Sequence, residues 1–373
     1  MDFEFSEEQK MLATMARDFF SKEYPVALVR EMAADERGYP PDLWKKVAGL
    51  GWLGLAFPEK YGGMGGSFLD LAILLEEMGR ACFAGPFFST VLLGGLTISD
   101  TGSENQKSTL LPQMANGDVI LTMALLESDG RYETSSIKTG AVVDGSEYII
   151  EGTKLFVENA HIADYILTPA RIEDKGITLF MVDAKSPGIS TELLHTETGS
   201  KQCEVVFNKV RVPQDNVIGK VGSGGEYIEA VLRRAAIAKC AEMIGGAKRV
   251  LEMTAEYAKE RVQFDHPIGS FQAIQQEFAN LAIDVESSTF ITYKAAWMLS
   301  EGLPCTEDVA IAKAWVSEAY RRATANSHQI YGTIAFTEDH DLPLYYRKAK
   351  ESEIAFGDAG FQRHIVAREF LEL

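Results

Sequence analysis

The sequence predicts an α+β protein made of three consecutive blocks. A helical N-terminal domain is expected over residues 1–117, a middle antiparallel β-barrel or β-sandwich domain over 118–225, and a C-terminal helical domain resembling a four-helix bundle over 226–373. Apolar residues recur at helical spacing in the outer blocks, and short β-rich runs separated by turn residues fill the middle block. Because helices and strands do not alternate, the pattern favours α+β over a Rossmann fold.

The N-terminal block begins with a clear helix start. Ser6 and Gln9 have the spacing of a capping box, and helix-spaced apolar residues follow them. Pro40 and Pro41 precede a second amphipathic run, DLWKKVAGL, at the position where a helix tolerates proline. Asp70–Phe83 is again amphipathic, so we expect helices throughout this block.

The sequence of the middle block predicts β-strands. Runs such as YIIEGTKLFV, ITLFMVD and EVVFNKVRV are rich in β-branched and aromatic residues, and turn pairs such as Asp144-Gly145 and Pro187-Gly188 separate them. The glycine-rich segment 219–226 predicts a hinge, after which helical periodicity resumes and glycine and proline are confined to joints.

Composition limits the class of protein. A chain of 373 residues predicts two to three domains. Its 36 basic and 54 acidic residues give a net charge of −18, which argues against nucleic acid or an anionic membrane as the main partner. No run approaches the roughly 20 apolar residues that cross a bilayer, and the acidic start MDFEFSEEQK leads us to expect no signal or transit peptide. Four widely spaced cysteines indicate reduced thiols and a cytoplasmic location.

Common motifs of nucleotide and metal sites are missing from the sequence. GSGGE at 222–226 is not a GxGxxG fingerprint, and the sequence has no Walker A, HExxH or GxSxG motif. The six histidines show no ligand spacing, so we expect no metal site.

One segment does suggest ligand binding. RVQFDHPIGSFQ, residues 261–272, places Arg261, Phe264, a proline turn and Gln272 at the joint of two predicted helices. An arginine can pair with a phosphate, and a glutamine can hydrogen-bond the edge of a heterocycle. Taken alone, such a segment is more often a structural turn than a ligand site.

This segment resembles the RxxFGxPIxxFQ motif of the acyl-CoA dehydrogenase family of flavoproteins. Other segments are similar to the family's first helix, early helical segment, flavin-facing strand, QxxGG stretch and closing helix; they are FSEEQKMLATMARDFF, GWLGLAFPEKYGGMGGSFLDLAILLEEMGR, EGTKLFVENAHIADYILTPAR, HQIYGTIAFTEDHDLPLYYRKAK and FQRHIVAREFL. Their order matches the three blocks inferred above.

The resemblance implies FAD as cofactor, bound between the β domain and the C-terminal helical domain, with a neighbouring subunit contacting its adenosine half. Arg261 matches the arginine that reaches the pyrophosphate. Phe264 and Gln272 match residues beside the adenine and ribose, and Gln329 and Gly332 match the loop that approaches the cofactor with its backbone.

The resemblance also places residues of the β block beside the flavin. Leu126 lies in ALLES, the counterpart of a segment whose backbone touches the flavin ring. Phe156 stands in the place of a tryptophan and can still stack on the ring, whereas Glu158 replaces Thr or Ser. A carboxylate near flavin N5 would oppose the charge of the reduced flavin, unless Glu158 points away. Thr333 and Ala335 replace two family glycines.

The implied reaction is α,β-dehydrogenation of an acyl-CoA thioester, in which a carboxylate removes the α-proton and flavin N5 accepts a hydride from the β-carbon. The thioester oxygen must be polarised, and the base must be desolvated. The family's usual base position is occupied by Phe356, and the alternative position, on the first helix of the C-terminal domain, by Ala235. Neither side chain can take a proton.

Three explanations remain open. A relocated carboxylate could serve, with Asp358 and then Glu242 as catalytic candidates; each could instead be structural, as a helix cap or an ion-pair partner. The chain could be a non-catalytic, FAD-completing subunit of a heteromeric dehydrogenase whose partner carries the base. The fold could also serve an elimination on a CoA ester that needs no such base.

The resemblance implies partners as well. Electrons would pass to an electron-transfer flavoprotein, and the chain would assemble as a homodimer, a homotetramer or a heterotetramer with a homologous subunit. A role in fatty acid or carboxylic acid degradation follows. The sequence leaves the acyl group undefined.

Overall fold

The computed structural model describes residues 4–371, and the chain divides into two compact units that interleave along the sequence. The first unit comprises the segment that ends at Arg30, Ser67–Phe83, and the segment that begins at Ala236. The second unit comprises Glu31–Gly66 and Ala84–Ala235. Helices contributing to both units are α2 (Val26–Ala34) and α7 (Gly224–Glu260).

The first unit is helical. Its own helices are α1 (Glu7–Glu23), α4 (Phe68–Arg80), α8 (Gln272–Ser300), α9 (Thr306–Tyr331), α10 (Leu342–Ile354) and α11 (Ala359–Leu371). The predicted capping box of α1 is confirmed. Gln9 N donates to Ser6 Oγ over 3.2 Å, and Ser6 N donates to Gln9 Oε1 over 3.1 Å, which satisfies two backbone donors at the helix start.

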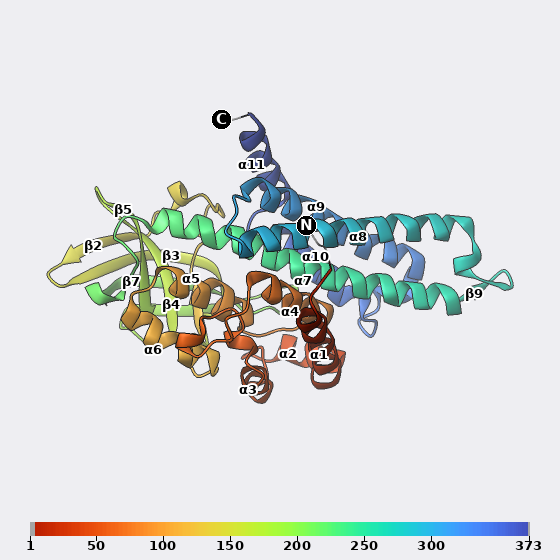
Figure 1. The fold of residues 1–373 in the computed structure, drawn as a ribbon, viewed down its shortest axis with the longest axis horizontal. Coiled ribbons are helices and arrows are strands. Elements are labelled where there is room, and N and C mark those ends of the chain that lie inside the picture. Colours follow the sequence, from red (N-terminus) through yellow and green to blue (C-terminus); the bar gives the residue numbers. More distant parts are fainter. Residues whose placement is uncertain (1–3, 372–373) are drawn as a thin grey trace. The chain divides into compact units, whose positions relative to one another are not determined.

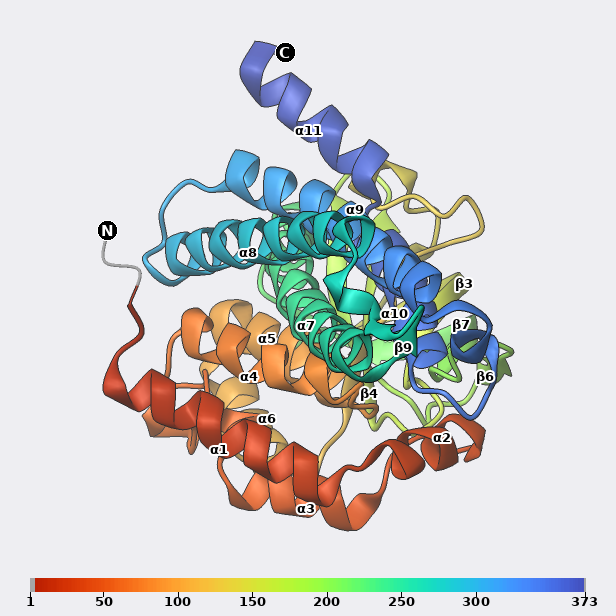
Figure 2. The ribbon, with the colours of Figure 1, turned by 90° about the vertical axis from the view of Figure 1, so that its right-hand side faces the viewer.

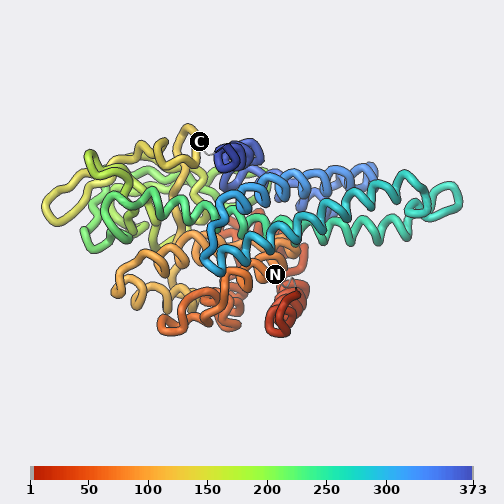
Figure 3. The backbone as a smooth tube through the Cα atoms, turned by 45° about the horizontal axis from the view of Figure 1, so that its top comes forward, coloured from red at the N-terminus to blue at the C-terminus, as the bar shows by residue number. Residues whose placement is uncertain are grey.

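Helices α8 and α9 run side by side and antiparallel (Figure 1, Figure 2). Two ion pairs link them: Arg322 pairs with Asp284, near the middle of α8, at 2.8 Å, and Lys294 pairs with Asp308, at the start of α9, at 2.6 Å. Between the end of α7 and the start of α8, a two-residue turn joins strands β9 (Val262–Gln263) and β10 (His266–Pro267) into a hairpin (Figure 3). The sequence predicted only a turn there.

Two glycines let α4 and α7 touch backbone to backbone inside the first unit. A Cβ added at Gly245 would lie 1.8 Å from Glu76 O, and one added at Gly79 would lie 2.0 Å from Glu242 O. No side chain can occupy such a gap, because real Cβ atoms do not approach an oxygen within 3.0 Å. The crossing of these helices therefore depends on glycine at both positions.

The second unit carries the sheet and several helical segments. The helical segments are α3 (Pro41–Gly49), a π-helix (Phe88–Gly95), α5 (Leu96–Thr101) and α6 (Glu104–Ala115). The strands are β1 (Leu121–Met123), β2 (Gly140–Asp144), β3 (Glu147–Glu158), β4 (Tyr165–Ile172), β5 (Gly176–Asp183), β6 (Ile189–Leu194), β7 (Gln202–Pro213) and β8 (Val217–Ile218).

Within residues 4–371 these strands form an eight-stranded sheet in the order β6-β7-β3-β2-β4-β5-β8, with β1 paired to β4. The predicted β block is confirmed, but the sheet is mixed: β4 pairs in parallel with β1 and with β2, while the other pairs are antiparallel. Turn residues signal hairpins between consecutive strands, whereas pairing between strands distant in sequence leaves no local mark. The core of the sheet includes Ile150, Ile166, Phe180 and Phe207, all at most 1% exposed.

The π-helix was not predicted. Its eight residues are all buried, and Gly94 packs so closely that an added Cβ would lie 2.4 Å from Leu121 Cδ2. Among the described residues, no helix is both long and apolar enough to cross a membrane.

Substituting Gly245 with alanine should destabilise the first unit strongly. The added methyl group would meet Glu76 O at 1.8 Å, and overpacking typically costs ~1–3 kcal/mol or more. Gly225, also on α7, is a matched control because an added Cβ would lie 3.8 Å from Thr134 Oγ1, an ordinary contact. Gly225→Ala should be neutral or slightly stabilising in denaturant unfolding. Equal effects of both changes would show that the α4–α7 contact is not tight.

Candidate functional site

The hairpin at the end of α7 presents an aromatic ring on a strained turn. Phe264 and Asp265 have φ values of 53° and 62°, so both central residues of the turn are left-handed, as in a type I′ turn. This conformation is costly for residues other than glycine. The Phe264 ring is 87% exposed, and its ring centroid lies 6.2 Å from that of Phe271. A strained turn that exposes an aromatic ring suggests a binding role.

Arg261 lies directly before this hairpin with its backbone fixed and its side chain free. Arg261 N donates to Tyr257 O, and Ile268 N donates to Arg261 O, each over 2.8 Å. The side chain is exposed, and no group within residues 4–371 accepts a hydrogen bond from its guanidinium. An unsatisfied, exposed guanidinium is suited to an anionic ligand such as a phosphate.

The structure brings the other predicted cofactor residues of the first unit to the same end of the helices. Gln272 is the first residue of α8 and Gln329 lies on the last turn of α9; both are exposed. Tyr257 on α7 stacks on Tyr331 on α9 with ring centroids 4.2 Å apart, which joins these helix ends. Ile268, Ile274 and Ile330 share one apolar cluster, which packs the hairpin region against both helices.

Gly332 follows α9 in a conformation that requires glycine. Its φ of 70° and ψ of −149° lie in a region essentially closed to other residues. An added Cβ would meet nothing within 4 Å, so the requirement comes from the backbone conformation and not from crowding. Thr333 is exposed and Ala335 is fully buried in the short helical turn that follows.

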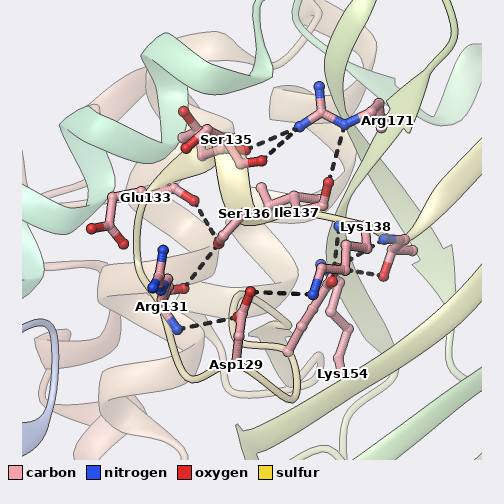
Figure 4. A network of polar contacts seen from close by, with 12 residues as sticks. Asp129, Arg131, Glu133, Ser135, Ser136, Ile137, Lys138, Lys154 and Arg171 are labelled. Atoms are coloured by element: carbon pink, nitrogen blue, oxygen red, sulfur yellow. Dashed lines mark hydrogen bonds and ion pairs between the residues drawn. The ribbon is translucent and has the colours of Figure 1, made fainter.

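In the second unit, a buried ion pair fixes the loop that contains Leu126. Figure 4 shows its lysine, Lys154, close to the polar contacts made by residues 129–138 and Arg171. Lys154 Nζ, with a fully buried side chain, donates to Glu127 Oε1 over 2.9 Å. The Glu127 carboxylate also accepts from Lys138 N at 2.8 Å and from Thr139 N at 3.0 Å. Leu155 N donates to Leu126 O over 2.9 Å. Loop and strand β3 are therefore held in one geometry.

The electrostatics of this pair favour the charged carboxylate. Burial on its own would raise the pKa of Glu127, but the Lys154 ammonium and the hydrogen bonds from Thr139 outweigh burial and lower that pKa to about 2. Burial lowers the pKa of Lys154, and Glu127 opposes that change.

Phe156 projects from a β-bulge next to this pair. The register between β3 and β7 shifts between Lys154 and Val157, and Phe156 has a φ of 56° with its side chain 50% exposed. A bulge redirects a side chain out of the regular alternation of the strand. Glu158 returns to the register opposite Gln202, and its carbonyl accepts from Thr122 Oγ1 over 2.6 Å. The orientation of the Glu158 carboxylate toward a flavin remains a prediction.

The two catalytic candidates both have structural partners. Asp358 is exposed, and its Oδ1 accepts from Phe361 N over 2.8 Å, which makes it the N-terminal cap of α11. Glu242 on α7 pairs with Lys239, one turn earlier, at 2.7 Å. Phe356 and Ala235 are buried. Each of these carboxylates thus makes a structural contact, and a catalytic role for either stays a prediction.

Sequence reasoning missed Lys154. A signal was present, because Tyr148, Ile150 and Lys154 occupy the same inward face of one strand, and a lysine there needs a buried acidic partner. Within the described residues, no group of three or more His, Cys, Asp or Glu side chains could hold a metal ion.

Removing Lys154 should cost more than removing the whole pair. Lys154→Met leaves the Glu127 carboxylate buried without its cation, and such a loss typically costs ~3–5 kcal/mol. Adding Glu127→Gln removes the unpaired charge and should recover most of that loss in denaturant unfolding. If the double variant unfolds as readily as Lys154→Met alone, the buried charge is not the source of the cost.

Comparison with known proteins gives a consistent result along the whole chain. The profiles of the acyl-CoA dehydrogenase N-terminal, middle and C-terminal domains match residues 6–118, 122–210 and 222–371. The chain is 32% identical over 382 residues to the probable acyl-CoA dehydrogenase YngJ of Bacillus subtilis, covering 100% of both chains. It is 31% identical to the short-chain specific acyl-CoA dehydrogenase of Clostridium acetobutylicum, covering 98% of this chain and 99% of that one.

Comparison with solved structures points to the same family as the sequence comparison. Butyryl-CoA dehydrogenase from Megasphaera elsdenii (29% identity) and the ChsE4-ChsE5 complex from Mycobacterium tuberculosis (30%) match with TM-scores of 0.92 and 0.93, covering 100% of both chains in each case. A structure described as the electron transferring flavoprotein of Acidaminococcus fermentans matches over 100% of both chains at 29% identity and TM-score 0.94. PigA with FAD and proline matches over 99% of both chains at 25% identity and TM-score 0.92. The chain belongs to the acyl-CoA dehydrogenase family, whose members are FAD-dependent oxidoreductases.

Proposed function

We propose that the chain is an FAD-dependent acyl-CoA dehydrogenase, or a subunit of one, that oxidises an acyl-CoA thioester between its α- and β-carbons. The observation that carries this proposal is the group formed by the Arg261 guanidinium, which no described residue satisfies, the exposed Phe264 ring and the Gly332 turn. Together they offer a cation, a stacking surface and an approachable backbone, as a dinucleotide requires.

The residues present fit FAD in chemical type. Arg261 would pair with the pyrophosphate, Phe264 and Gln272 would flank the adenine and ribose, and Gln329 with the Gly332 backbone would close around them. In the second unit, the Leu126 backbone and the half-exposed Phe156 ring would contact the flavin, with Glu158 beside it. When bound, FAD supplies the acceptor for the two electrons and the β-hydrogen.

A second candidate function is favoured by the positions where the base is expected. Phe356 and Ala235 cannot accept a proton, Asp358 caps a helix and Glu242 is paired with Lys239. A desolvated carboxylate is what abstraction of the weakly acidic α-proton needs. This pattern supports a non-catalytic, FAD-completing subunit of a heteromeric dehydrogenase. The similar ChsE4-ChsE5 structure is a complex of two differently named chains, which agrees with that arrangement.

The partners follow from the same reasoning. We infer that electrons pass to an electron-transfer flavoprotein, and that the chain assembles with a second copy or with a homologous subunit, since the Phe264 ring is 87% exposed and the Arg261 guanidinium has no acceptor among the described residues. We place the protein in the cytoplasm, because Cys82, Cys203, Cys240 and Cys305 are all buried free thiols.

Arg261→Ala should weaken FAD binding without loosening the fold. A hydrogen bond to a charged group is worth ~1.5–3 kcal/mol, so the FAD dissociation constant should rise by about 10- to 150-fold. Lys259→Ala is the matched control, because it removes the same charge from an exposed position on the last turn of α7. Equilibrium dialysis of the apoprotein, alone and with any co-purifying subunit, measures both constants. Purified protein that stays colourless in both preparations contradicts FAD binding altogether.

Asp358→Asn should leave flavin reduction by acyl-CoA unchanged in the assembled enzyme. Asparagine keeps the helix cap, so only a base would be lost. Stopped-flow bleaching of the flavin measures the rate. A fall of about 100-fold or more would instead assign the base to Asp358, since general bases contribute ~10²–10⁴-fold.

A further inference from the structure

A cavity of about 410 Å³ lies in the first unit, between the end of α9, the short turn Gly332–Phe336 and the start of α10. Its volume falls in the range of ~300–1,000 Å³ that is usual for small-molecule sites. Three rings, one guanidinium and two small apolar residues line it: His328, Phe336, Tyr346, Arg347, Ala325 and Pro343. The proposed cofactor residues Gln329 and Gly332 do not line this cavity.

Arg347 gives the cavity a positive charge. Its side chain is partly buried, and its Nε donates to Pro343 O, one turn earlier on α10, over 3.3 Å. The terminal nitrogens Nη1 and Nη2 have no acceptor among residues 4–371, and none of the residues that line the cavity is acidic. A guanidinium with two free donor groups can hold a carboxylate or a phosphate through two parallel hydrogen bonds.

His328 lies in the wall of the cavity in a fixed orientation. The residue is 8% exposed, and its Nδ1 lies 2.8 Å from Thr324 O. Because a carbonyl oxygen only accepts hydrogen bonds, Nδ1 carries a proton and donates it to this oxygen. Nε2 makes no hydrogen bond within the described part of the chain, so this nitrogen is available to a ligand.

Two aromatic rings flank this imidazole. The ring centroids of Phe336 and Tyr346 lie 5.1 Å and 5.3 Å from that of His328. Phe336 is 71% exposed and Tyr346 is 41% exposed, so both still offer ring surface to a ligand. Aromatic rings favour another flat ring in an offset-stacked or edge-to-face arrangement. The cavity therefore combines ring surface with a cation.

One wall of the cavity is held in place by contacts within the chain itself. Residues 337–341 connect the turn that contains Phe336 to α10. Arg30 on α2 donates to Asp339 O and to His340 O, each over 3.2 Å, and pairs with Asp341 at 2.8 Å. A preformed site loses less conformational freedom on binding than a site that the ligand must order.

We propose that this cavity binds a small ligand that consists of a flat aromatic ring and one anionic group. The anionic group pairs with Arg347, the ring packs against Phe336 and Tyr346, and His328 Nε2 hydrogen-bonds a polar atom of the same ligand. An aryl carboxylate and a purine nucleoside monophosphate share this chemistry. Because the residues proposed to hold FAD do not line the cavity, the inference does not rest on the proposed function.

Isothermal titration calorimetry of the purified protein, with and without saturating FAD, tests the ligand class. Benzoate carries both the ring and the charge, benzamide keeps the ring without the charge, and cyclohexanecarboxylate keeps the charge without an aromatic ring. Benzoate should bind more tightly than either of the other two. Adenosine monophosphate separates the two sources: tighter binding than benzoate indicates a nucleotide, and weaker binding indicates an aryl carboxylate.

Variants test the residues. Arg347→Gln should raise the dissociation constant of the tighter probe by ~10-fold or more, because a charged hydrogen-bond partner is lost. Phe336→Ala should raise it by ~2- to 12-fold, as expected for the loss of one aromatic pair. Ala325→Leu should block the cavity and spare the fold, since position 325 is exposed and leucine is a good helix former. Arg368→Gln, which removes an exposed arginine from α11, is the matched control and should change nothing.

Several results overturn the inference. Neither benzoate nor adenosine monophosphate binds at millimolar concentration, or cyclohexanecarboxylate binds as tightly as benzoate, which leaves no role for the rings. Unchanged affinity in Arg347→Gln and Ala325→Leu places the bound probe elsewhere. Loss of probe binding on addition of FAD assigns the cavity to the cofactor. If neither probe binds and Phe336→Ala dissociates an oligomer, the rings form a contact between subunits and not a ligand site.

Discussion

The ion pair between Lys154 and Glu127 is the constraint on which the part of the second unit around Leu126 and Phe156 depends. Its carboxylate gathers two backbone N–H groups and one ammonium, so the loop around Leu126 and the strand before Phe156 cannot move independently. Replacing such a pair by apolar residues is often neutral or favourable for stability. Its presence here is therefore better explained by the geometry it imposes on its neighbours than by the free energy of unfolding.

Much of the fold was predictable because neighbouring residues in the sequence determine where its helices begin. The capping box at Ser6 and the helix opened by Pro41 follow from nearest neighbours in sequence, and the structure contains both. The parallel pairing of β1 with β4 and the π-helix at Phe88–Gly95 were not predictable, because each depends on packing between distant segments. Local propensity carries no information of that kind.

The residues of the candidate site also fall into two groups: those that a local sequence motif identifies and those whose role depends on distant partners. Arg261, Phe264 and Gln272 stand close together in sequence, so their motif could be recognised, and all three are exposed in the structure. Lys154 was missed although its place on the inward face of β3 indicates burial, because the role of a buried lysine is clear only when its acceptors are known. The partners of Asp358 and Glu242, an amide at the start of α11 and Lys239, likewise could be identified only in the structure.

The strained turn at the end of α7 affects how the newly synthesised polypeptide behaves before it assembles. Phe264 is exposed there, and Ile334 and Phe336, 53% and 71% exposed, lie on the turn that follows α9. Water-facing apolar surface of this kind promotes non-specific aggregation until a partner or ligand covers it. A solitary polypeptide would then be a substrate for chaperones, and the yield of soluble protein would depend on how quickly it finds its companions after synthesis.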